Sequence, residues 1–82
     1  MERNIKLIWD FYGPMAEGTA AHHQIHLDQY ALSNGFEVYL TGHQNFDQNN
    51  SEAFLVVKER DMLKVRDDLK PHRAEVYHEK IS

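Results

Sequence analysis

The hydrophobic pattern of this chain changes period in an order that few folds accommodate. Apolar residues first alternate with polar ones, as in a half-buried strand, and then recur at helical spacing. Four further segments follow: a second alternating segment, a nearly continuous apolar run, a second stripe at helical spacing and a final alternating segment. The predicted elements are a strand at residues 5–12, a helix at 14–33, strands at 36–41 and 53–58, a helix between Asp61 as its N-cap and Pro71, and a strand at 74–79.

This order, β-α-β-β-α-β, is that of the ferredoxin-like sandwich. Right-handed crossovers leave few other topologies for it. We therefore predict an α+β fold with a four-stranded antiparallel sheet and both helices on one face. The first and third strands lie at the centre of that sheet, and residues 1–82 form one domain.

A domain of this size has a thin core and needs further stabilisation. The sequence has 82 residues and no cysteine, which excludes disulfides and leaves association as the simplest source. The sheet face away from the helices should carry Ile8, Tyr12, Tyr39 and Tyr77, a large apolar area to leave in water. We predict a homodimer of the dimeric α+β barrel type, formed through this face. Scattered exposed aromatic residues on an open sheet are the alternative.

The net charge and the apolar runs of the chain indicate which classes of partner are unlike those that it binds. A formal net charge of −4 argues against nucleic acid, because a duplex binder needs a cationic face. No apolar run is long enough to span a membrane, and residues 1–4 carry no secretory signal pattern. The expectation is a soluble cytoplasmic protein.

The topology predicts where polar side chains meet. Strands one and two run parallel, so their carboxyl ends share one edge of the sheet, and the second helix returns to that edge. The polar segment at residues 42–51 is expected to be a loop over it. The residues expected to converge there are Asp10, Tyr12, His43, His72 and Arg73. Asp10 should have a partner, because an unpaired carboxylate on a central strand is costly.

The first helix adds three histidines. His22 and His26 stand four residues apart on one side of the helix, a spacing that suits a two-histidine metal half-site, although no acidic residue lies between them. An exposed helix face without a metal is the alternative. His23 lies within the apolar stripe and is interpreted as a buried, hydrogen-bonded core histidine.

Two parts of the chain also resemble a known family. His26-Leu27, Tyr30, Gly35 and Leu40-Thr41-Gly42, with the tail from Pro71 to Tyr77, are similar to the YCII-related family of dimeric α+β barrel proteins. The resemblance implies a ferredoxin-like dimer in which a helix histidine and an aspartate form a proposed catalytic pair. The histidine corresponds to His26. Lys70 stands where the family has its aspartate, and Asp68 lies near but out of register.

Three functions follow from these patterns. The first is binding or conversion of a small molecule, with His26 or His22 as general base and Asp10 orienting it. Tyr12, His43, His72 and Arg73 would line that site, and Arg73 would favour an anionic group. The second is a non-catalytic protein-association module. The third is a divalent metal site that uses His22 and His26, and no other cofactor is expected.

Overall fold

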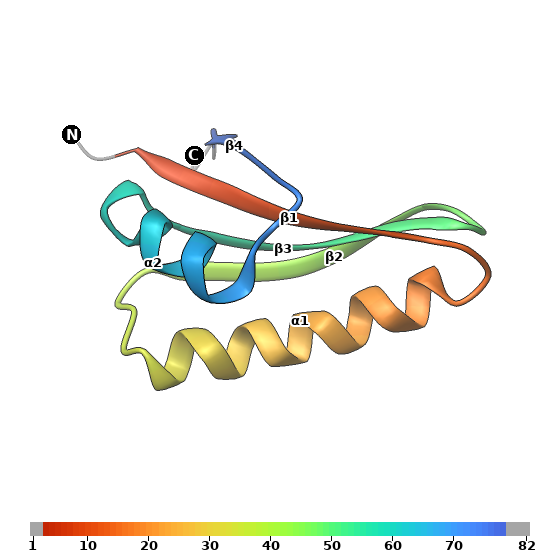
Figure 1. The fold of residues 1–82 in the computed structure, drawn as a ribbon, viewed down its shortest axis with the longest axis horizontal. Helices are drawn as coiled ribbons and strands as arrows, with labels where there is room; N and C mark the ends of the chain where they lie inside the picture. Colours follow the sequence, from red (N-terminus) through yellow and green to blue (C-terminus); the bar gives the residue numbers. More distant parts are fainter. Residues whose placement is uncertain (1–2, 79–82) are drawn as a thin grey trace.

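The computed structural model describes residues 3–78 and has the predicted ferredoxin-like architecture (Figure 1). Its sheet has the order β2-β3-β1-β4, with every neighbouring pair antiparallel. The central position of the first and third strands is thereby confirmed. The elements are β1 (Asn4–Tyr12), α1 (Ala16–Ser33), β2 (Tyr39–Asp47), β3 (Asn50–Lys58), α2 (Glu59–Leu69) and β4 (Arg73–Tyr77).

The core lies between the sheet and the two helices, which cover the same face. Alternate residues of β1 and β3 point into it, because side chains of a strand alternate between faces. Trp9 is 4% exposed, and its indole N–H donates to the carbonyl of Leu69 at 3.0 Å, which fixes the end of α2 over β1. The buried apolar members of this core are Ile5, Leu7, Trp9, Ala20, Leu27, Ala31, Ala53, Leu55, Val57 and Val65.

Helix α1 meets the sheet through small residues. Ala16, Ala20 and Ala31 are buried beside Leu27, and small side chains let the helix backbone approach the strands. The helix ends at Ser33 and is followed by Asn34 and by Gly35, whose φ of +69° is readily adopted only by glycine. Its first residue is Ala16 rather than residue 14, and α2 likewise begins at Glu59, two residues before the predicted cap.

The second strand differs from the prediction. Residues 42–51 do not form a loop: β2 continues to Asp47 and pairs with β3, with an irregularity between Asn45 and Asp47. A tight turn joins the two strands, in which the carboxylate of Asp47 accepts the backbone N–H of Asn49 at 2.8 Å. Residues 36–38 precede the strand. The prediction failed after residue 41 because the side chains of residues 43–47 are exposed and show no apolar alternation, and backbone pairing leaves no mark on composition.

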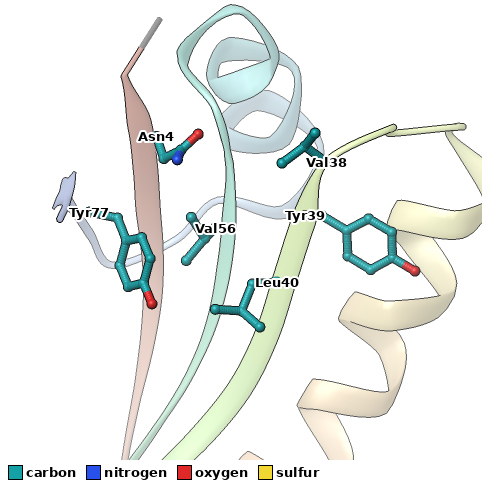
Figure 2. A pocket seen from close by; sticks show the side chains of 6 residues that line it. All are labelled: Asn4, Val38, Tyr39, Leu40, Val56 and Tyr77. Atoms are coloured by element: carbon teal, nitrogen blue, oxygen red, sulfur yellow. The ribbon is translucent and has the colours of Figure 1, made fainter. Parts of the chain in front are cut away.

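The corrected strand changes which face two residues occupy. Tyr39 pairs with Val57, a core residue, and therefore lies on the helix-covered side, not on the open face. Leu40 pairs with Val56 and lies on the open face instead. Figure 2 shows the ring of Tyr39 directed toward α1, while Leu40, Val56 and Tyr77 point to the other side of the sheet.

The last strand is shorter than predicted. It spans Arg73–Tyr77, and residue 79 of the predicted strand lies outside the described residues. Within residues 3–78, neither helix combines the length and the apolar character needed to cross a membrane.

Candidate functional site

Asp10 lies at one end of an ion-pair network on the open face of the sheet. Arg73 donates from Nε and Nη2 to its two carboxylate oxygens at 3.0 and 3.1 Å. Nη2 of Arg73 also donates to Glu52 at 3.1 Å, and Nζ of Lys6 lies 3.3 Å from the same carboxylate. These four residues form the ion network. Asp10 and Glu52 stand opposite each other on β1 and β3, and Ile8 stands opposite Arg73 on β4.

The network confirms the prediction that Asp10 has a partner. The Glu52 side chain is only 3% exposed, so its charge depends on the two cations beside it. The hydrogen bonds from Arg73 lower the pKa of Asp10, and the same contacts raise the pKa of Arg73. Two acids and two bases thus neutralise one another, and the Arg73 guanidinium is already occupied within the molecule.

His72 lies beside the same segment of β1 but in the plane of the sheet. Its backbone N–H donates to the carbonyl of Ile8 at 2.9 Å, and its Nδ1 accepts the backbone N–H of Asp10 at 2.8 Å. The imidazole thus continues the ladder of β4 by one more hydrogen bond. Because Nδ1 accepts, the proton of the neutral ring is on Nε2. Asp10 therefore orients a histidine through its backbone, not through its carboxylate.

His23 lies on the helix-covered side of the same segment. Its ring centroid is 5.1 Å from that of Trp9 and 5.5 Å from that of Phe11. Its Nε2 is buried and, among residues 3–78, has no hydrogen-bond partner. Burial lowers the pKa of His23, and the charges of His26, His72 and His22 lower it further. The interpretation of His23 as a hydrogen-bonded core histidine was therefore wrong for this nitrogen.

His22 and His26 lie next to His23 along α1. Their Nε2 atoms are 3.0 Å apart, and their ring centroids are 4.6 Å apart with the planes at 82°. Both side chains are exposed. They are distinct from His23 and His72, the two imidazoles that contact residues 9–11 and that we call the histidine site.

The other two residues predicted at this edge are His43 and Tyr12. His43 belongs to β2 and faces α1, where its Nδ1–H donates to Oε1 of Gln24 at 2.6 Å. Tyr12 is 75% exposed at the end of β1, opposite Asn50. The structure therefore brings Asp10, His72 and Arg73 together, places His43 on the helix-covered side, and leaves Tyr12 exposed at the end of β1 on the same face as Asp10.

The open face also contains a shallow depression of about 190 Å³ (Figure 2). Leu40 and Val38 beside it are 42% and 48% exposed, whereas Val56 at its base is 5% exposed. The residues that line it are Asn4, Val38, Tyr39, Leu40, Val56 and Tyr77. It lies near the start of β1, where Lys6 of the ion network stands opposite Val56, whereas Asp10, Glu52 and the histidine site lie toward the other end of that strand.

The structure also bears on the expected metal site and on the resemblance to the YCII-related family. Among residues 3–78, no three histidine or acidic side chains are grouped closely enough to hold a metal ion together. Asp68, the acid nearest to the family's aspartate, accepts hydrogen bonds from the Tyr30 hydroxyl at 2.6 Å and from Lys64 at 3.1 Å. Comparisons of the chain with protein-family models, curated proteins and solved structures found no match.

The structure adds two residues that sequence reasoning missed. Glu52 precedes the apolar run of β3 and was not singled out, although a single acid at the start of a buried strand signals a need for cations. His23 was assigned to the core because it falls within the apolar stripe of α1. Periodicity gives the face on which a side chain lies, but it cannot show whether a ring nitrogen finds a partner there.

Proposed function

We propose that this domain binds a small polar molecule at the histidine site, with His23 as the residue that receives it. The observation that supports this is the buried Nε2 of His23, which lacks a partner among the described residues. Buried polar atoms in native proteins are almost always hydrogen-bonded, so one that is not calls for a ligand or ordered water. A hydroxyl, amide or carboxyl group of a ligand would satisfy it.

The surroundings of His23 support binding of a small, partly flat molecule. Phe11 is only partly buried and offers aromatic surface beside the imidazole, and such surface favours planar groups. His72 contributes a second polar group, because its Nδ1 is bound to Asp10 and its Nε2 carries the proton. The occupied guanidinium of Arg73 gives no support to the anion preference expected from the sequence.

The test is NMR detection of the histidine Cε1–H signals during addition of a library of small carboxylic acids, phenols and amides. We expect some compounds to shift the signals of His23 and His72 together. His23→Phe keeps a ring against Trp9 and Phe11 but removes the nitrogen, and it should abolish these shifts. His43→Gln is the matched control. Because His43 lies on β2, its replacement should leave the shifts of the His23 and His72 signals unchanged. Compounds that bind His23→Phe as well as the wild type would refute the proposal, as would a library that shifts neither signal.

A second proposal concerns self-association, and a separate observation favours it. The depression on the open face is flanked by exposed Leu40 and Val38 and adjoins an ion network whose four charges sum to zero. In a twofold dimer the same patch meets itself. A patch with one sign of charge would repel its copy, whereas a neutral, partly apolar patch does not. We propose that a second copy of the chain covers this face and that the domain resides in the cytoplasm, where a fold without disulfides is at no disadvantage.

Sedimentation equilibrium with Leu40→Lys tests the dimer. Two copies of this charge would face each other across the twofold axis, so we expect dissociation by at least about tenfold, or 1.4 kcal/mol. Ile25→Lys is the matched control, because Ile25 is similarly exposed, at 54% against 42%, but lies on α1. A wild-type protein that sediments as a monomer at every concentration would refute the dimer, as would equal effects of the two variants.

A further inference from the structure

The two exposed histidines of α1 already hold the geometry of a chelate. His22 and His26 are one helical turn apart, and the same ring nitrogen, Nε2, of each ring faces that of the other. The Nε2 atoms are 3.0 Å apart. A hydrogen bond between the rings holds them together, so little side-chain freedom remains to be lost when an ion replaces the shared proton.

The nitrogen–nitrogen distance indicates which ions fit. With metal–nitrogen bonds of about 2.05 Å, a separation of 3.0 Å corresponds to a nitrogen–metal–nitrogen angle of about 94°. This is close to the right angle between neighbouring ligands in square-planar or octahedral coordination. It is smaller than the angle of about 109° that tetrahedral Zn²⁺ prefers. Cu²⁺ and Ni²⁺ adopt the former geometries with imidazole ligands, and Cu²⁺ has the higher intrinsic affinity.

We propose that His22 and His26 form a two-imidazole site for a divalent late transition metal, with Cu²⁺ bound most tightly. No third histidine or acidic ligand joins the pair among residues 3–78, so the remaining coordination positions are open to water or to a small ligand. This proposal does not rest on small-molecule binding at His23, because the two nitrogens that would bind the metal belong to His22 and His26.

Metal binding requires a defined change in the two rings. In the hydrogen bond of the metal-free pair, one Nε2 carries the proton and the other accepts it. Both Nε2 atoms must be free of protons to bind a metal, so both rings must carry the proton on Nδ1. The change is visible in the nitrogen NMR spectrum with diamagnetic Zn²⁺, independently of any activity.

The test is titration of untagged protein with Cu²⁺, Ni²⁺ and Zn²⁺ salts, each alone, by calorimetry, with electron paramagnetic resonance of the Cu²⁺ form. We expect one Cu²⁺ per chain, a signal split by two nitrogens, and affinity in the order Cu²⁺, then Ni²⁺, then Zn²⁺. His22→Gln and His26→Gln should each lower Cu²⁺ affinity at least about tenfold, since either leaves one imidazole. Glutamine is a good helix former, so α1 should be preserved.

Two controls separate this proposal from the one on small-molecule binding. His78→Gln removes an exposed histidine outside the pair and should leave Cu²⁺ binding unchanged. His23→Phe should also retain Cu²⁺ while it abolishes small-molecule binding. Absence of Cu²⁺ binding, Cu²⁺ binding that survives His22→Gln, or tighter binding of Zn²⁺ than of Cu²⁺ would each overturn the chelate. None of these outcomes would bear on the small-molecule proposal.

Discussion

Replacement of Arg73 by methionine tests whether the ion network stabilises the fold. The change removes three charge-assisted hydrogen bonds, two to Asp10 and one to Glu52, but keeps an aliphatic chain on β4 opposite Ile8. Hydrogen bonds to charged groups contribute about 1.5–3 kcal/mol each when buried. The Arg73 side chain is 49% exposed, so solvent screening reduces the sum, and we expect a loss of about 2 kcal/mol. In a domain of this size that lowers the Tm by about 10 °C.

The pH dependence of this variant provides a second readout. The pKa of Asp10 is lowered in the folded protein, so its ionised form contributes stability above the unfolded pKa of about 3.9. That contribution is lost as the pH falls through the lower folded pKa. Without Arg73 the pKa of Asp10 returns toward its ordinary range, and the acid-induced loss of stability in Arg73→Met should be shallower than in the wild type.

Urea denaturation at several pH values, combined with the variants Asp10→Asn and Asp10→Asn/Arg73→Met, measures both effects. Direct contact predicts a coupling energy of about 1 kcal/mol between the two substitutions. A loss below about 0.5 kcal/mol for Arg73→Met, or strictly additive effects, would show that water replaces the network at little cost.

Three other substitutions test the packing of the fold by urea denaturation. Gly42→Ala places a Cβ atom against the ring of Phe54, so the ring must move, and we expect a loss of about 1 kcal/mol; a gain in stability would mean that the reduced backbone entropy of the unfolded chain outweighs this contact. Trp9→Phe removes the hydrogen bond to the Leu69 carbonyl and should cost about 1–2 kcal/mol; an unchanged stability would mean that water satisfies the carbonyl. Gly35→Ala should cost about 1 kcal/mol because its φ is +69°, and a neutral effect would show that the end of α1 adjusts.

The sequence was sufficient to predict those elements whose burial pattern is periodic. Residues 5–12 alternate because β1 is central and one of its faces lines the core, and the structure differs only by adding Asn4. Helix α1 was predicted to within two residues from its buried alanines and from Gly35. Both elements bury a regular set of positions, and burial of this kind is what a hydrophobic pattern records.

The sequence was insufficient for β2 because that strand is stabilised by its backbone. Seven of its nine residues are exposed, and its pairing with β3 requires no apolar side chain on either face. The turn residues from Asp47 to Asn50 offered the one usable signal. Asp and Asn favour tight turns, and the Asp47 carboxylate does accept the N–H of Asn49. A hairpin with this turn would have placed His43 in a strand.

The prediction of the site was incomplete for a different reason. It considered at which edge of the sheet each strand ends, but not which face of the sheet each side chain occupies. Topology correctly brings the end of β1 and the start of β4 together, and Asp10, His72 and Arg73 do meet there. Side chains of consecutive residues point to opposite faces, however, so arrival at one edge does not place two residues in one site.

Residues 9–11 of β1 illustrate the consequence. Trp9 and Phe11 face the helices and contact His23, whereas the Asp10 side chain faces the open side and binds Arg73. His72 reaches this segment in the plane of the sheet, through the Asp10 backbone. One short stretch of a central strand therefore serves an imidazole on one face and an ion network on the other. A substitution of the Asp10 side chain should disturb the network yet leave the His72 hydrogen bond in place, because that bond needs only the peptide N–H.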